Sequence, residues 1–239
     1  MLFYVIFYRK QEIKISLKNF KWNPDTVKQI YSVAVPAFFI ISTGSFMVMG
    51  INFILTKISA AAVAIFGIYY KLQTFVYMPT SGITQGAMPI MGYNYGAKNK
   101  KRLLEALNYS MIICAGINLL GTMLFWIFPK EILSCFNASY EMIEIGVPAL
   151  KIISTSFVLG SICFIFSCFF QSLGMGTASL LITLLRQFLI LIPLAFVLGN
   201  IFGLKGVWWS FIIAEFITCI CSLIIYKHHS KKDLVLKRI

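Results

Sequence analysis

The sequence predicts an all-α membrane protein, built as a six-helix transmembrane bundle, on three observations. Of the 239 residues, 59% are hydrophobic and only 12% are charged, with a mean hydropathy of +0.84, whereas soluble domains carry about 25% charged residues. Six apolar stretches each reach the roughly 20 residues that a helix needs to cross hydrocarbon. None of them shows the polar–apolar alternation of a membrane β-strand, so we expect helices throughout.

The elements follow from these stretches in chain order. We expect residues 1–30 to be the end of a truncated preceding helix followed by a basic cytoplasmic linker, and residues 229–239 to be a basic cytoplasmic tail. Residues 31–228 form the predicted six-helix lobe. Its six spans are 31–55, 60–93, 104–128, 143–170, 179–198 and 207–226.

The chain's first eight residues are apolar but too short to span a bilayer, and basic residues follow them rather than precede them as in a signal peptide. We interpret this stretch as the cytoplasmic end of the preceding helix, with a short interfacial anchor as the alternative. Further along the linker, Asn23 and Pro24 can start a helix, because Asn caps helix ends and Pro suits the first turn.

Positive charge marks the cytoplasmic side. The chain has 21 Lys and Arg against 8 Asp and Glu. Six of the basic residues lie in 9–28, four in 98–102 and five in 227–238, which are alternate connections and the tail. This is the pattern of the positive-inside rule. It predicts a multi-pass protein of the cell membrane with both termini cytoplasmic and the lipid bilayer as a partner, and it argues against nucleic-acid binding.

Catalytic and metal-binding constellations are missing from the predicted spans. They hold no Asp, no His and no paired carboxylates, and the 6 cysteines of the chain are scattered in mostly apolar surroundings. Enzymes and metal sites need clusters of such groups. We therefore expect no enzyme, no cofactor, no metal site and no disulfide framework.

Three charged residues lie well inside the spans, where charge is expensive. Lys71 is a candidate cavity residue together with Tyr70 and Gln73, and the alternative is a lysine that extends to the outer interface. For Arg186 we favour contact with cytoplasmic headgroups. Glu215 could couple an ion by shuttling a proton, or it could form a structural lock with Arg186 or Lys71; we favour the lock.

Two uncharged polar residues complete the cavity candidates. Asn52 lies in the first span and Gln171 at the end of the fourth. Such groups more often pack helices or bond to the backbone than line a path. If one face does line a cavity, we expect the first, second and fourth spans to provide it.

The second predicted span is too long for a straight crossing and contains helix-bending residues. Its 34 residues would measure about 50 Å, against about 30 Å of hydrocarbon. Prolines interrupt helical hydrogen bonding, and glycines four residues apart allow a neighbouring helix to approach closely. The predicted hinge and packing residues are Pro79, Gly82, Gly86, Pro89 and Gly92.

This part of the chain also carries a resemblance to a known family. The run from Gly82 to Lys98, GITQGAMPIMGYNYGAK, resembles one in multidrug and toxin extrusion transporters, at the end of the second helix of their C-terminal lobe. The runs YYKLQ at 69–73, LRQF at 185–188 with IP at 192–193, and FGLKGVW at 202–208 are similar to further family segments. The resemblance extends from about Tyr31 to the tail.

The resemblance implies a twelve-helix exporter of two lobes with a cavity between them. Such a protein works by alternating access and exchanges an amphipathic or cationic small-molecule substrate for H⁺ or Na⁺. This chain would be its C-terminal half, with a missing N-terminal lobe as partner. Some branches of the family have acidic ion ligands on the first and fourth helices of this lobe; here the first predicted span has no carboxylate, and the fourth has only Glu144 at its start. We expect the chain alone not to transport.

Two alternatives stay open. A lipid-linked oligosaccharide flippase has a related fold, and the cations Lys71 and Arg186 could match its anionic substrate. A non-transporting membrane fragment is the other possibility.

Overall fold

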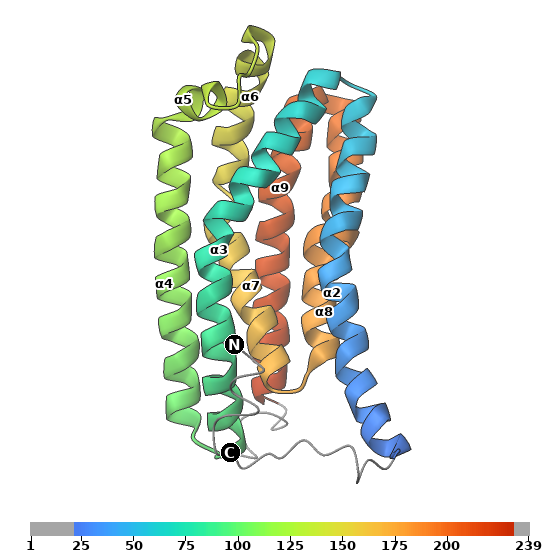
Figure 1. Cartoon of the computed structure of the whole chain (residues 1–239), viewed down its shortest axis with the longest axis vertical. Helices are drawn as coiled ribbons and strands as arrows, with labels where there is room; N and C mark the ends of the chain where they lie inside the picture. Colours follow the sequence, from blue (N-terminus) through green and yellow to red (C-terminus); the bar gives the residue numbers. More distant parts are fainter. Residues whose placement is uncertain (1–21, 232–239) are drawn as a thin grey trace, which may run out of the picture. The chain divides into compact units, whose positions relative to one another are not determined.

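Figure 1 shows a computed structural model of the chain, which describes residues 22–231. The predicted helix end at residues 1–8, most of the basic linker and the last part of the tail lie outside the described residues. The chain divides into two units, Met1–Val35 and Pro36–Ile239. In the first unit, Asn23 Oδ1 accepts hydrogen bonds from the amides of Asp25 and Thr26, at 3.0 and 3.4 Å. The predicted helix start at Asn23 and Pro24 is therefore confirmed.

The described residues fold almost entirely into helices, which confirms the all-α prediction. The long helix α2 (Pro24–Thr56) starts in the first unit and continues into the second. The elements that follow are α3 (Ala60–Gly96), α4 (Lys100–Ile127), α5 (Pro129–Ser134), α6 (Tyr140–Ser154), α7 (Phe157–Ser172), α8 (Gly176–Leu184), the π-helical η2 (Leu185–Leu189) and α9 (Leu191–Lys231).

Side-chain caps mark the start of two helices in the second unit, α4 and α6. Asn99 caps α4, because its Oδ1 accepts from the Arg102 amide at 3.2 Å, and Ser139 caps α6 by accepting from the Met142 amide at 3.3 Å. Helix α4 packs against α3 and α7. Figure 1 shows α3 tilted in its first part and more upright in its second.

The count of six separate spans is not confirmed. By length and composition, four helical segments of the described chain could each cross a membrane, and five if α6 and α7, bent by 46°, are one span. The predicted fifth and sixth spans fall within one apolar segment, Gly176–His228. The two predicted spans form one segment because helix continues on both sides of Gly203. The backbone of Gly203 itself leaves the helical region, with a φ of 62° and a ψ of −144°.

Two apolar clusters form the core of the second unit. One is centred on Phe66, Phe157 and Trp208, and the other on Leu107, Phe166 and Phe169. Polar contacts also join helices: Asn118 of α4 donates from Nδ2 to Thr80 Oγ1 of α3 at 2.8 Å. The unit is therefore held by two apolar regions and by buried hydrogen bonds between its helices.

Candidate functional site

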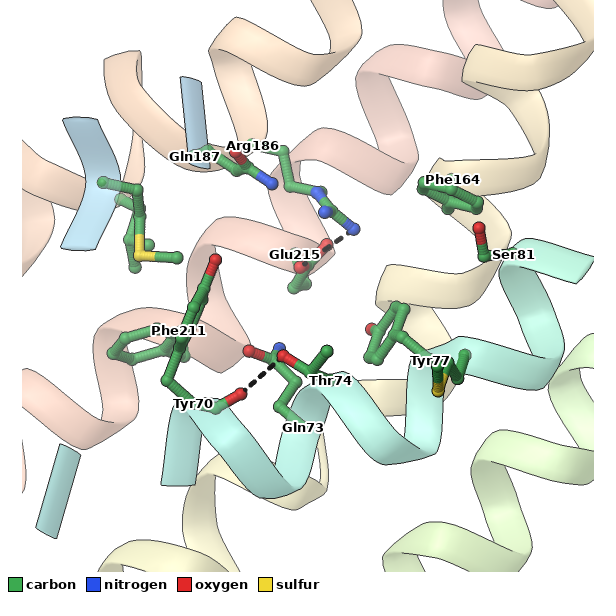
Figure 2. Close-up of a pocket in the computed structure, with 13 residues that line it drawn as sticks. Tyr70, Gln73, Thr74, Tyr77, Ser81, Phe164, Arg186, Gln187, Phe211 and Glu215 are labelled. Carbon is green, nitrogen blue, oxygen red and sulfur yellow. Dashed lines mark hydrogen bonds and ion pairs between the residues drawn. The ribbon is translucent and has the colours of Figure 1, made fainter. Parts of the chain in front are cut away.

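A cavity of about 340 Å³ opens among α2, α3, α7, η2 and α9 of the second unit. Figure 2 shows its lining, with α3 on one side and the η2 residues opposite. Aromatic, thioether and polar side chains are mixed around it. The lining residues are Met47, Tyr70, Gln73, Thr74, Tyr77, Met78, Ser81, Phe164, Arg186, Gln187, Leu191, Phe211 and Glu215.

Helical periodicity explains the contribution of α3. Tyr70, Thr74, Tyr77 and Ser81 recur at three- or four-residue intervals and so share one face of the helix. The hydroxyl of Thr74 donates to the Tyr70 carbonyl at 2.8 Å, and the hydroxyl of Tyr77 donates to the Phe157 carbonyl of α7 at 3.2 Å. These bonds orient two of the polar groups on the cavity wall.

The π-helical segment η2 contributes two consecutive residues to the cavity, as α3 does with its pairs at 73–74 and 77–78. In an α-helix, neighbours differ by about 100° around the axis. A π-turn is wider, and such turns occur frequently at functional sites. Arg186 and Gln187 both lie in η2 and both line the cavity.

An ion pair lies at the centre of the site. Arg186 Nη1 is 3.7 Å from Glu215 Oε1, and both side chains are only 14% exposed. The same nitrogen donates to the Gly160 carbonyl of α7 at 3.2 Å. The pair therefore joins η2, α7 and α9.

Gly160 is the residue that makes room for this arrangement. A Cβ built on Gly160 would lie 3.0 Å from Glu215 Oε1 and closer still to the Tyr77 hydroxyl. The absence of a side chain at this position lets α7 approach α3 and α9 at the height of the pair.

Two acceptor oxygens at the cavity lack a hydrogen-bond donor among the described residues. They are Glu215 Oε2 and Gln187 Oε1, and both atoms are buried. An unpaired buried acceptor costs about 1–3 kcal/mol. Each of these two oxygens can therefore still accept a hydrogen bond.

The structure separates the predicted cavity residues into two groups. Tyr70 and Gln73 line the cavity, whereas Lys71, Asn52 and Gln171 are not among its lining residues. Lys71 is exposed on α3, because the residue after Tyr70 points to another side of the helix. Asn52 is partly buried, and its Oδ1 has no hydrogen-bond partner among the described residues.

Arg186 does not follow its predicted role. We expected it to reach cytoplasmic headgroups, but its guanidinium points inward to Glu215 and to the Gly160 carbonyl. The pairing of Glu215 with Arg186, one of the predicted arrangements, is present. Arg186 lies in the π-helical segment η2, which the sequence analysis did not predict.

The predicted hinge residues lie along α3. Pro79 and Pro89 fall inside the helix. A Cβ built on Gly82 or Gly86 meets no atom within 4 Å, so the predicted close helix contact is not made within the described chain. Gly92 does approach a neighbour, because a Cβ there would lie 3.2 Å from the Ser172 carbonyl oxygen.

Sequence reasoning missed the polar cavity residues Tyr77, Thr74, Ser81 and Gln187. The α3 members could have been found from their spacing relative to Tyr70. Gln187 had only its proximity to Arg186 as a signal. Aromatic and neutral polar residues are common in membrane helices, so residue type alone does not distinguish them.

A second cavity of about 200 Å³ shares Phe164, Arg186 and Gln187 with the first. Ser167 and Thr183 line it, with Ser167 Oγ 3.2 Å from Thr183 Oγ1, and Ser167 Oγ is also 2.6 Å from Ser179 Oγ outside the lining. Within residues 22–231, no group of three or more His, Cys, Asp or Glu could hold a metal ion.

Comparison with known proteins identifies what this architecture is similar to. The model of the MatE family matches residues 36–197. Multidrug export protein MepA of Staphylococcus aureus (strain MSSA476) is 27% identical over 227 residues, covering 94% of this chain and 50% of the relative. MepA of Staphylococcus haemolyticus (strain JCSC1435) is 26% identical over 226 residues, with the same coverage of 94% and 50%. The chain thus spans about half the length of these relatives.

Solved structures share the fold. An outward-facing multidrug resistance MATE family transporter superposes with a TM-score of 0.90 at 22% identity, over 100% of this chain and 54% of that chain. A MOP superfamily transporter from Pyrococcus furiosus gives 0.87 at 22% identity, over 95% and 52%.

Proposed function

Since this chain belongs to the MatE family, we propose that it is one lobe of a multidrug exporter and that the cavity of Figure 2 contributes to the substrate path. The relatives are export proteins and transporters, so the chain is not an enzyme, as predicted. With several apolar helices it is a multi-pass membrane protein. The observation that carries the proposal is a mixed apolar and polar cavity, centred on an ion pair, within this fold.

We propose six crossings for the lobe. The bent pair α6–α7 supplies the fourth crossing, α8 with η2 and the first part of α9 supplies the fifth, and the remainder of α9 supplies the sixth. The backbone at Gly203 supports a reversal there, because its φ of 62° with ψ of −144° leaves the helical region. With an even number of crossings, both termini lie on one side, and the basic clusters favour the cytoplasm of a cell membrane.

The chemistry of the lining favours amphipathic substrates. Tyr70, Tyr77 and Phe211 offer aromatic surface, Met47 and Met78 offer adaptable thioethers, and these groups suit varied organic molecules. The unpaired oxygens of Gln187 and Glu215 could accept hydrogen bonds from a substrate donor.

We propose Glu215 as the group that couples H⁺ or Na⁺ binding to the substrate cavity. Its Oε1 faces Arg186 at 3.7 Å, beyond ordinary hydrogen-bond length, and its Oε2 has no donor in the described chain. A cation at this carboxylate would compete with Arg186 and change the charge of the cavity. The structural lock is the alternative role, and the pH dependence of substrate binding separates the two.

A missing N-terminal lobe is the proposed partner. The chain spans half the length of its curated relatives, and Gly82 and Gly86 on α3 leave open space that another helix could enter. The lipid-linked flippase is less well supported, because Lys71 does not line the cavity and Glu215 offsets the charge of Arg186.

Binding of a fluorescent amphipathic cation to the full chain in detergent tests the proposed cavity. We expect Gln73→Leu to weaken binding about tenfold, because it replaces a polar wall group that a bound donor would use; this corresponds to about 1.4 kcal/mol. Lys71→Gln is the matched control, since it changes a neighbouring position outside the lining. Equal affinity of Gln73→Leu and the wild-type chain, or equal losses in both variants, would contradict this use of the cavity.

A further inference from the structure

A second kind of site lies beside the interruption in α9. A cavity of about 430 Å³ is lined by Leu198 and Phe202 before Gly203 and by Lys205, Gly206, Trp209 and Ile213 after it. None of these residues lines either cavity at the ion pair. We call it the α9 groove.

The α9 groove has an apolar wall and one cationic end. Phe202 and Trp209 are 64% and 51% exposed. Gly206, Trp209 and Ile213 follow one another at three- and four-residue intervals, which places them on one side of the helix. The helix rises about 12 Å from Lys205 to Ile213. The apolar wall of the groove therefore extends along α9 away from the lysine.

No salt bridge within the described part of the chain offsets the charge of Lys205. Among residues 22–231 the salt bridge is that between Arg186 and Glu215, and Lys205 takes part in none. A lysine with its amine at the membrane surface and its stem along apolar side chains is typical of the interface. Trp is likewise enriched there, where its ring meets both headgroups and hydrocarbon.

We propose that the α9 groove binds an anionic phospholipid, with the phosphate at Lys205 and an acyl chain along Trp209 and Ile213. The apolar wall alone would accept any lipid, but the unpaired cation favours an anionic headgroup. The site is independent of the proposed transport cavity, and its test does not require transport.

Quenching of Trp209 fluorescence by brominated lipids tests the proposal on the full chain in vesicles. Subtracting the signal of Trp209→Phe isolates this residue. At equal mole fraction, we expect brominated phosphatidylglycerol to quench Trp209 about fivefold more effectively than brominated phosphatidylcholine, the preference expected from one basic residue near the surface. Lys205→Gln should remove the difference.

Lys130→Gln is the matched control, because Lys130 is an exposed lysine of α5 that does not line the groove. It should keep the wild-type preference. Equal quenching by the two lipids in the wild-type chain, or an unchanged preference in Lys205→Gln, would overturn the proposal. Shielding of Trp209 from both lipids that grows with protein concentration would also overturn it, because a second copy would then occupy the groove.

Discussion

At the scale of single residues, the Arg186–Glu215 pair is the feature that needs the most explanation. Both side chains are largely buried, yet their separation of 3.7 Å gives contact without a short hydrogen bond. Taking two charges out of water is costly unless geometry and additional hydrogen bonds compensate. Arg186 gains one by donating to the Gly160 carbonyl, whereas Glu215 Oε2 has no hydrogen-bond partner within residues 22–231. The geometry of this pair is therefore weak evidence that it stabilises the fold.

Removing one partner should reveal how tightly the two charges are coupled. We expect Glu215→Gln to lower the free energy of unfolding by on the order of 3 kcal/mol, since it leaves the Arg186 charge buried without its counter-charge. Adding Arg186→Met should recover most of this loss. Unfolding in detergent, followed by circular dichroism, measures both. A double variant no more stable than Glu215→Gln would contradict the pairing.

The pH dependence of substrate binding separates coupling from a structural lock. If Glu215 binds the coupling proton, dye binding by the wild-type chain should change with pH, and Glu215→Gln should bind with much weaker pH dependence. A lock predicts the same pH dependence in both proteins once each is confirmed to be folded. The measurement is a dye titration at several pH values.

At the scale of elements, interruptions of helices shape the site and the topology. The π-turn η2 brings Arg186 and Gln187 to one cavity, and Gly203 separates the two parts of α9. The combination of φ and ψ at Gly203 belongs to a region that is essentially restricted to glycine. Side chains at this position would therefore be strained.

We expect Gly203→Ala to destabilise the chain by about 1–3 kcal/mol, the cost of a residue held in such a conformation. Gly67→Ala is the matched control, because a Cβ at this helical glycine meets nothing within 4 Å. It should be neutral or stabilising by about 0.5–1 kcal/mol, the helix preference of Ala over Gly. Thermal unfolding of the two variants side by side checks this, and equal melting temperatures would refute the expectation.

The limits of sequence-based prediction are also clearest for these elements. The helix start at Asn23 was predictable because Asn caps helix ends, and the predicted span 60–93 starts with α3 and ends three residues before Gly96. Glu215 and Arg186 stood out because charge is rare in apolar spans. The π-turn had no such marker, so the inward direction of Arg186 was missed. Lys71 was predicted to line the cavity because of its depth along the span. Its side chain points to another side of the helix, so it is not among the lining residues.

At the scale of the whole molecule, the proposed orientation makes a prediction about accessibility. Cys135 is an exposed free cysteine between α5 and α6, and the other described cysteines are buried or partly buried. In intact cells, a membrane-impermeant maleimide should label Cys135 and should not label a cysteine introduced by Lys100→Cys in the Cys135→Ser background. Permeabilised cells should show labelling of both. Labelling of both positions in intact cells would refute the orientation.

The bend between α6 and α7 has a mechanical consequence. The carbonyl of Lys151 accepts from Trp126 Nε1 at 3.0 Å, from Ser154 Oγ at 3.2 Å and from Thr155 Oγ1 at 3.0 Å. An oxygen released by a broken helix would otherwise face hydrocarbon unpaired. Ser154 and Thr155 follow Lys151 in the same segment, so their bonds move with it, whereas a shift of this bend away from α4 would remove the bond from Trp126.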